Sequence, residues 1–184
     1  MEIIDLKSKI RQNLPKFPTT ERPQTSSSMK EQLLNWPEFH KSQKIAFYQS
    51  LNDEICLDFL FECNKQLYLP KYDTEKAIYE SAFVANRASL TIGRFGIREP
   101  SMACPVAEKN EIDLWLVPAL AFDRQGNRLG RGAGFYDRLL QNERGIKAGI
   151  IYRHRLIENI PVDSWDIKMN FILTDKEIIK CNNN

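Results

Sequence analysis

A short apolar run, Leu114-Trp115-Leu116-Val117, constrains the fold of this chain most strongly. A continuous run of this kind, ended by Pro118, is typical of a strand buried on both faces, and such strands occur mainly in parallel sheets covered by helices. The alternation of strand and helix patterns predicts an α/β fold with a mainly parallel sheet and helices on both faces. Because the chain has 184 residues, we expect one domain over residues 1–184. The other predicted strands are residues 45–48, 67–69 (ended by Pro70), 78–84 (with a less regular period), 148–152 and 171–173.

Four helices are predicted from apolar spacing and from prolines that end them. The first covers residues 3–14 and ends at Pro15. Lys7 and Arg11 lie one turn apart along the border of its apolar stripe, so they can reach toward whatever the helix packs on. The proline- and serine-rich residues 15–28 are expected to form a loop, with Ser28 capping a second helix. That second helix is expected over residues 29–36. A third is predicted from Asp53 to residue 61, where the residues are apolar nearly all round, and a fourth over residues 136–143.

The composition excludes several classes of protein. The net charge is only +2, so no strong basic field favours nucleic acid or membrane partners. The first residues contain acids and no long apolar run, so neither a signal peptide nor a spanning helix is expected. We expect no zinc site and no disulfide scaffold, and a cytoplasmic monomer that acts on small molecules. The cysteines form no CxxC pair and the histidines lie far apart: Cys56, Cys63, Cys104, Cys181, His40 and His154.

Half of the eight glycines fall in nine positions, residues 126–134, directly after the buried strand. Glycine permits positive φ and close approach of backbone N–H groups, and a helix that starts after such a loop completes an anion site. Arg128 and Arg131 add cationic groups that can bind phosphate oxygens. Asp123 and Asp137 bracket the loop, where a carboxylate beside phosphate can hold Mg²⁺. The segment therefore predicts a phosphate site, although a purely structural loop is the alternative.

Three known glycine motifs do not fit this segment. A Walker A loop requires Lys followed by Ser or Thr, which follow no glycine here. A dinucleotide fingerprint would need glycine where Phe135 stands. The aromatic motif of RNA-recognition domains should continue as a strand, whereas residues 136–140 have a helical pattern.

The segment from Val117 to Asp137 resembles the 5-formyltetrahydrofolate cyclo-ligase family, also called 5,10-methenyltetrahydrofolate synthetase. That family carries a block of the form VPG-hydrophobic-AFD-xx-G-xRLG-xG-xGYYD. This chain reads VPALAFDRQGNRLGRGAGFYD over 21 positions in nearly unbroken register. The resemblance spans roughly residues 6–175. Further matches are residues 7–11, Glu21-Arg22 followed by Ser28, Glu54, residues 96–100 and Asp166.

The resemblance implies an ATP- and Mg²⁺-dependent conversion of 5-formyltetrahydrofolate to 5,10-methenyltetrahydrofolate, with release of ADP and phosphate. In this chemistry ATP phosphorylates the formyl oxygen, and nitrogen 10 of the substrate then attacks the activated carbon. Positioning and charge stabilisation dominate both steps, and no protein nucleophile is needed. A non-catalytic folate- or nucleotide-binding module on the same fold is the alternative.

The resemblance also implies roles for individual residues. Arg131 and Asp137 would be catalytic, and Asp137 and Asp166 would hold Mg²⁺. The folate would contact Glu54, Phe95, Arg131, Gly132, Ala133, Gly134 and Phe135. ATP would be bound by Lys7, Ser8, Lys9, Ile10 and Arg11, and by Arg128, Leu129, Gly130, Arg131, Gly132, Ala133, Gly134, Phe135 and Tyr136.

Structural roles are the alternative for most of these residues. Asp137 could cap the following helix, and Glu54 could complement a helix dipole. Asp166 could be a solvated loop acid, and Lys7 with Arg11 a pair of surface cations. Phe95 and Tyr136 could simply belong to the core. The chain departs from the family pattern at Ala119, Phe135 and Asn170, and the change at Asn170 raises a question about cation binding.

Overall fold

The computed structural model describes residues 2–15, 22–93, 96–108 and 110–182. Within them the largest sheet has seven strands in the order β12-β11-β9-β6-β1-β2-β3. The pairs from β11 to β2 are parallel, whereas β12 and β3 pair antiparallel at the two edges. The prediction of a mainly parallel sheet is confirmed. The strands are β1 (Lys44–Ala46), β2 (Gln66–Asp73), β3 (Ile78–Val84), β6 (Leu114–Pro118), β9 (Ile146–Ile150), β11 (Phe171–Leu173) and β12 (Ile178–Lys180).

Strand β6 divides the core into two layers because its side chains point alternately to opposite faces. All five of its residues are buried. Leu114 and Leu116 belong to one apolar cluster, and Trp115 and Val117 belong to another. The apolar run is therefore the doubly buried strand that the sequence predicts.

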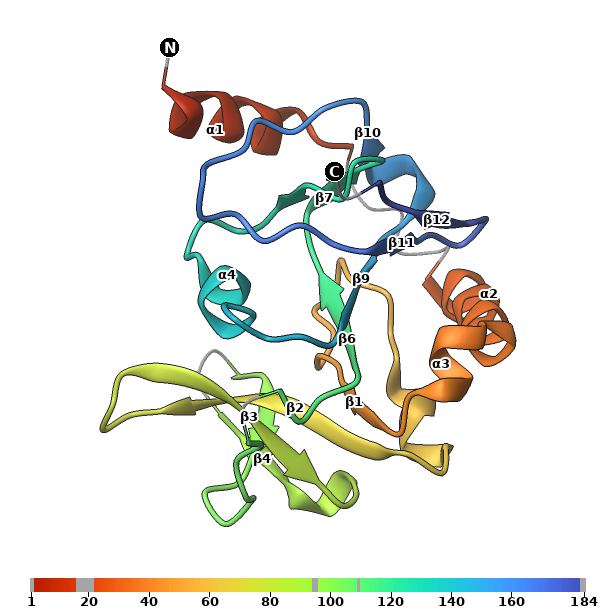
Figure 1. Cartoon of the computed structure of the whole chain (residues 1–184), viewed down its shortest axis with the longest axis vertical. Helices are drawn as coiled ribbons and strands as arrows, with labels where there is room; N and C mark the ends of the chain where they lie inside the picture. Colours follow the sequence, from red (N-terminus) through yellow and green to blue (C-terminus); the bar gives the residue numbers. More distant parts are fainter. Residues whose placement is uncertain (1, 16–21, 94–95, 109, 183–184) are drawn as a thin grey trace.

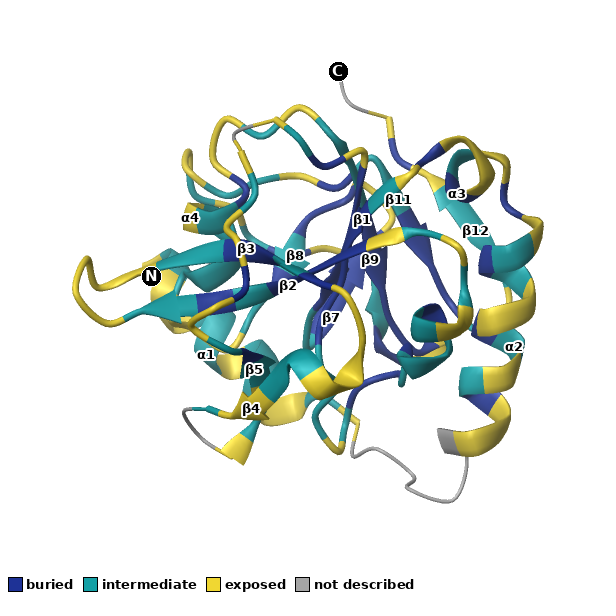
Figure 2. Cartoon of the chain, turned by 90° about the horizontal axis from the view of Figure 1, so that it is seen from below, coloured by how far each residue is buried: buried dark blue, intermediate teal, exposed yellow. Residues whose placement is uncertain are grey.

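Helices cover both faces of this sheet, as predicted. Met29 and Leu33 of α2 (Arg22–Asn35) and Phe39 of α3 (Pro37–Lys41) pack in the cluster that contains Leu114. On the other face, Leu140, directly after α4 (Phe135–Leu139), joins the cluster of Trp115. Figure 1 shows α2 and α3 on one flank of the central strands and α4 on the other. The central strands are buried, whereas the turn between β2 and β3 is exposed (Figure 2).

Two smaller sheets complete the fold. Strands β10 (Leu156–Ile157), β7 (Ala121–Asp123) and β8 (Arg128–Leu129) form one, in that order. Helix α1 (Ile3–Asn13) packs on this sheet through Ile10, and Leu14 beyond its end joins the same contact. Strands β4 (Leu90–Ile92) and β5 (Arg98–Pro100) form an antiparallel pair. Short 3₁₀ helices cover Asp58–Glu62, Arg87–Ser89 and Arg153–Arg155.

Several element boundaries predicted from the sequence are wrong. Helix α2 begins at Arg22 instead of residue 29, because Pro23 is tolerated in a first turn and the serines continue the helix. The apolar segment after Asp53 forms turns and a 3₁₀ helix instead of an α-helix, with Ile55 and Leu57 buried as irregular chain. Strand β2 continues through Pro70, since its pairing with β1 ends at Tyr68 and no ladder bond on that side is lost. The last predicted helix is shorter, α4 ending at Leu139.

No helix among the described residues is both long and apolar enough to cross a membrane. The cysteines are free thiols, with Cys104 and Cys181 buried and Cys56 and Cys63 half-buried.

Packing on β9 predicts a strong effect of one added methyl group. A Cβ atom at Gly149 would lie 2.5 Å from Cζ of Phe122 and 2.8 Å from Cδ1 of Ile172, both completely buried residues. We expect Gly149→Ala to lower the free energy of unfolding by about 1–3 kcal/mol, because the core cannot move aside without strain. Urea denaturation measures this loss.

Gly93→Ala is the matched control. The added Cβ would meet only the side chain of Glu99, whose end can move, so the change should stay below about 1 kcal/mol. Equal losses in the two variants would show that the packing of β9 on Phe122 is not the cause.

Candidate active site

A cavity of about 540 Å³ lies where α1, the glycine segment and the ends of several strands meet. Its walls come from α1, residues 48–54, the β2–β3 pair, residues 97–99 and 118–119, residues 128–137 and the turn at 163–166. Tyr48, two residues after β1, and Pro118, the last residue of β6, line it, so the cavity lies at the carboxyl edge of neighbouring parallel strands. This is the usual ligand position in open α/β sheets.

The glycines of the loop are required by close contacts and by positive φ angles. A Cβ atom at Gly130 would lie 2.6 Å from Nη1 of Arg128. Gly132 has φ +104° and Gly134, the residue before α4, has φ +60°, both in the region that favours glycine. Nε of Arg11 donates to the carbonyl oxygen of Gly130 at 3.0 Å. The loop is thus held between α1 and the Arg128 side chain.

Arg128 and Asp137 form a buried ion pair. Nη2 of Arg128 donates to Oδ2 of Asp137 at 2.6 Å, and the Arg128 side chain is only 7% exposed. The backbone N–H of Ile167 approaches the other carboxylate oxygen at 3.4 Å. The residue that caps α4 is Gly134, so the alternative role of Asp137 as a helix cap is wrong.

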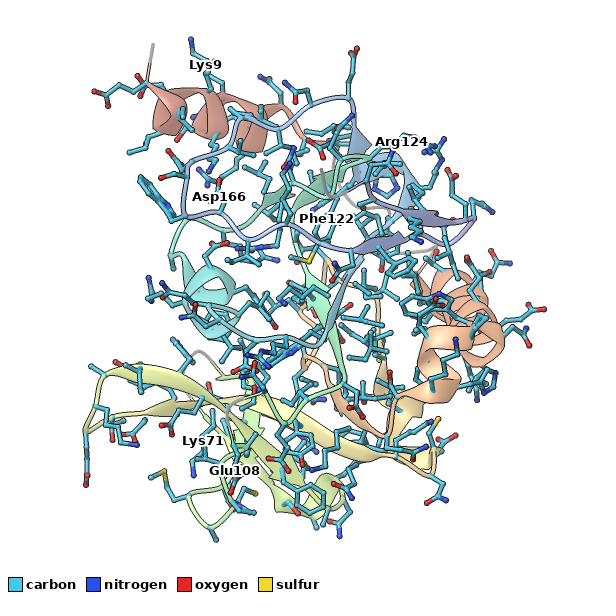
Figure 3. All side chains as sticks on the ribbon, in the orientation of Figure 1. Lys9, Lys71, Glu108, Phe122, Arg124 and Asp166 are labelled. Carbon is cyan, nitrogen blue, oxygen red and sulfur yellow. The ribbon has the colours of Figure 1, made fainter. Side chains whose placement is uncertain are left out.

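Lys7 binds two carboxylates of the 163–166 turn. Its Nζ lies 2.9 Å from Oδ2 of Asp163 and 2.6 Å from Oδ2 of Asp166. Burial lowers the pKa of Lys7, but the bonds to Asp166 and Asp163 outweigh this effect and raise it overall. Both ends of the contact are largely buried, so the alternatives of a surface cation and a solvated loop acid are wrong. Figure 3 shows Asp166 beneath α1, whereas Lys9 extends away on the outer side of the helix.

Arg131 and Glu54 meet on the opposite wall. Nη2 of Arg131 lies 2.6 Å from Oδ1 of Asp53 and 3.3 Å from Oε1 of Glu54. The second oxygen of Glu54 accepts the Leu51 N–H at 2.9 Å. Burial raises the pKa of Glu54 although these two contacts favour its charged form. Glu54 lies in a turn and not in the first turn of an α-helix, so the helix-dipole alternative is wrong for this residue.

Aromatic side chains line the part of the cavity beside β3. The rings of Tyr79 and Phe135 are 4.1 Å apart, and those of Phe135 and Tyr136 are 4.7 Å apart, all at steep angles. Burial raises the pKa of Tyr136, and also that of Tyr48, well above the usual value, so both phenols stay neutral near pH 7. The wall is aromatic and uncharged, which suits contact with a planar ring.

Most residues predicted for the site line this one cavity. Asn170 lies outside it and pairs with the backbone of Lys147, so nothing connects its departure from the family pattern with cation binding. Phe95 lies outside the described residues. Ser8, Lys9, Ile10 and Leu129 do not line the cavity, and Ile10 and Leu129 pack together beneath α1. The predicted residues that line it are Lys7, Arg11, Glu54, Arg128, Gly130, Arg131, Gly132, Ala133, Gly134, Phe135, Tyr136, Asp137 and Asp166.

The sequence interpretation missed several polar and aromatic contributors. Asp53 was recognised only as the start of a helix, and it binds Arg131 and lies 3.6 Å from Nη1 of the buried Arg155. Asp163, three residues before Asp166, could have been found from that spacing. Tyr79 and Trp165 carried no local signal, because strand pairing and the turn bring them to the cavity.

Two carboxylates of the cavity, Asp137 and Asp166, suit a cation that phosphate oxygens and water also bind. In the described part of the chain, no three His, Cys, Asp or Glu side chains cluster so as to hold a metal ion by themselves. Asp123 does not contribute. It is completely buried and accepts hydrogen bonds from Gln125, Asn127 and Ile160, which makes it a structural residue of the turn after β7.

Comparison with known proteins agrees with this geometry. The model of the 5-formyltetrahydrofolate cyclo-ligase family matches residues 4–175. The chain belongs to this family. A 5-formyltetrahydrofolate cyclo-ligase of Haemophilus influenzae is 34% identical over 175 residues, covering 90% of this chain and 91% of the relative. The corresponding protein of Escherichia coli K12 is 27% identical over 92% of this chain and 98% of its own.

A solved structure extends the likeness to three dimensions. The 5,10-methenyltetrahydrofolate synthetase of Aquifex aeolicus superposes with a TM-score of 0.85 at 33% identity, over 100% of this chain and 95% of that one. Members of the cyclo-ligase family are ligases that form a carbon–nitrogen bond, and this chain is an enzyme of that class.

The environment of Glu54 predicts a pH-dependent contribution to stability. The pKa of Glu54 is raised above 4.5 in the folded protein, so the folded state binds the proton of this carboxyl group more tightly than the unfolded state does. Protonated Glu54 therefore contributes stability below pH 4.5, and this contribution is lost as pH rises through the higher pKa of the folded state. We expect Glu54→Gln to gain stability relative to the wild type as pH rises across this window. Urea denaturation between pH 4 and pH 7, a range of about three units around these pKa values, measures the difference.

Glu111→Gln is the control, with the opposite sign. Its hydrogen bond with Lys44 lowers the pKa of Glu111, so that carboxylate stabilises the fold above pH 4.5 and the contribution is lost as pH falls through the lower folded pKa. Measured from below pH 4.5 upward, this variant should therefore lose stability relative to the wild type as pH rises. If the stability of the two variants relative to the wild type changed with pH in the same direction, the raised pKa of Glu54 would be contradicted.

Proposed function

We propose that this enzyme converts 5-formyltetrahydrofolate and ATP to 5,10-methenyltetrahydrofolate, ADP and phosphate, through a phosphorylated formyl intermediate. The proposal rests mainly on one observation. The glycine loop with Arg128 and Arg131 lines the same cavity of about 540 Å³ as the aromatic wall does. Membership of the cyclo-ligase family supports the same reaction. We further propose that it acts in the cytoplasm as a monomer, on small molecules only.

The loop and α1 supply the nucleotide side of the proposed site. Arg11 and Arg128 flank Gly130, and the N–H groups of residues 132–134 precede α4. These groups would bind phosphate oxygens through charge-assisted hydrogen bonds. Arg131, whose side chain is 47% exposed, is free to turn from Asp53 toward the transferred phosphoryl group and stabilise its charge.

The folate would lie on the other side of Arg131. Glu54 offers a largely buried carboxylate that can accept hydrogen bonds from the donor edge of a pterin, and Phe135 with Tyr79 offers an apolar face. Phe135 lacks the hydroxyl of the family's usual tyrosine, so its contribution is ring contact only. Held in this way, the formyl oxygen would attack the terminal phosphorus and the bond to ADP would break. Nitrogen 10 would then attack the formyl carbon and lose its proton to solvent, and the formyl oxygen would leave as phosphate.

A magnesium ion fits this arrangement through Asp137 and Asp166. The described lining carries five cationic and five acidic side chains, so its formal charges cancel before any ligand binds. A nucleotide that arrives with a divalent cation preserves this balance better than a bare polyanion. The ion would neutralise phosphate charge, while Arg128 fixes the carboxylate of Asp137 at 2.6 Å.

Replacing Asp137 tests the site directly. We expect Asp137→Asn to reduce turnover by about 10²-fold or more, because one charged group that acts on the transition state is lost. The assay supplies 5-formyltetrahydrofolate, ATP and Mg²⁺ and follows the absorbance of the methenyl product. Asp5→Asn, an exposed acid on α1, is the matched control. Folded Asp137→Asn with wild-type turnover would remove Asp137 from the site, and wild-type protein that binds both substrates without turnover would favour a binding module.

Lys7 tests which side of the cavity holds the nucleotide. We expect Lys7→Ala to raise the KM for ATP by about tenfold with a smaller change in the KM for folate, since a cation beside the phosphates is lost. Gln12→Ala on the exposed part of α1 controls for changes in the helix itself. A larger rise in the KM for folate would assign α1 to the folate instead.

A further inference from the structure

Trp165 is an exposed aromatic residue at the rim of the cavity. Its surface is 69% exposed, whereas Trp36 and Trp115 are 4% and 3% exposed. Ile4 of α1 lines the same cavity and is 68% exposed. Two large apolar side chains therefore remain open to water at one end of a site that is otherwise rich in charge.

The turn that carries Trp165 is firmly held. The N–H of Asp166 donates to the carbonyl of Asp163 at 3.1 Å, and the N–H of Asp163 donates to Oδ2 of Asp166 at 2.8 Å. Lys7 binds both carboxylates and ties the turn to α1. Trp165 is the third residue of this hydrogen-bonded turn. Its side chain is therefore exposed on a segment whose backbone is held in place.

One face of α1 connects this apolar end with the phosphate loop. Ile4, Lys7 and Arg11 all line the cavity, and their spacing of three and four residues places them on one side of the helix. Arg11 binds the carbonyl of Gly130, so the helix runs from the glycine loop to the rim. The rise from Arg11 to Ile4 is about 10 Å along the axis, comparable to a nucleotide extended from its phosphates to its base.

We propose that Trp165, with Ile4 of the same cavity lining, binds the purine base of the nucleotide, the indole stacking on the base. This inference rests on the proposed ATP-dependent function. The geometry favours the nucleotide over the folate at this rim, because the groups proposed for the folate lie elsewhere: Tyr79 of β3 packs against Phe135, and Glu54 contacts Arg131. Figure 1 shows α1 and β3 at opposite ends of the molecule with α4 between them. Trp165 is a binding residue that sets affinity for the base, separate from the groups that hold the phosphates.

Calorimetric titration of the folate-free enzyme tests the proposal without turnover. MgATP and magnesium tripolyphosphate are compared as ligands, since the second carries the phosphates and no base. We expect Trp165→Ala to raise the Kd of MgATP roughly tenfold, because stacking of a base on an aromatic ring is lost, and to leave the Kd of tripolyphosphate within about twofold. Trp165→Phe, which keeps a ring, should stay close to the wild type, as should Val162→Ala, an exposed apolar control on the same segment.

Fluorescence locates the effect in the wild-type protein. Trp165 is the exposed indole, so acrylamide quenching reports mainly on it, and MgATP should protect it whereas tripolyphosphate should not. Unchanged MgATP affinity in Trp165→Ala, equal loss for both ligands, or weakened binding of 5-formyltetrahydrofolate alone would each overturn the inference, the last in favour of a folate ring at this rim. Wild-type protein that binds neither MgATP nor tripolyphosphate would instead overturn the proposed ATP-dependent function itself.

Discussion

The ion pair between Arg128 and Asp137 is the contact on which the site depends. It joins the end of β8 to the first turn of α4, and the Ile167 N–H links the same carboxylate to the carboxy-terminal segment. The guanidinium also lies so close to Gly130 that a Cβ atom there would be 2.6 Å from Nη1 and would require the ion pair to shift. A buried pair of this kind is costly to break, because removal of one partner leaves an uncompensated charge. This one interaction therefore ties the glycine loop to α4 and neutralises one cation and one anion of the cavity.

The same principle of internal neutralisation extends to two further cations of the cavity. Lys7 is bound by Asp163 and Asp166, and Arg131 by Asp53 and Glu54. Each cation is held in a defined position before any anion arrives, which reduces the ordering cost of binding. The cost is that phosphate oxygens must compete with carboxylates. Arg131, with a half-exposed side chain, can exchange partners more readily than the almost fully buried Arg128. Under the proposed function, Arg131 is therefore suited to phosphoryl transfer and Arg128 to positioning.

The sequence predicted the central strands and the contents of the site better than it predicted element boundaries. Residues 114–117 are buried on both faces and the glycine segment contains positive φ angles. Both properties depend on residue types that are adjacent in the sequence, so the sequence pattern predicted them. The segment after Asp53 was misread as a helix because uniform apolarity indicates burial but not conformation, and tertiary packing decided the latter. Tyr79 and Trp165 could not be found, because they reach the cavity through strand pairing and a turn closed by distant Lys7.

The position of the cavity follows from the order of the strands. Strands β1 and β6 are parallel neighbours, so their carboxyl ends open on the same edge, and the segments that follow them, residues 48–54 and 118–137, must diverge there. Divergence leaves a space between Glu54 on one side and the glycine loop on the other, which Arg131 bridges at 3.3 Å. The proposed reaction brings a phosphoryl donor to a second substrate, and a cationic group between the two binding regions would serve both. Arg131 lies between the two segments because the topology places them face to face.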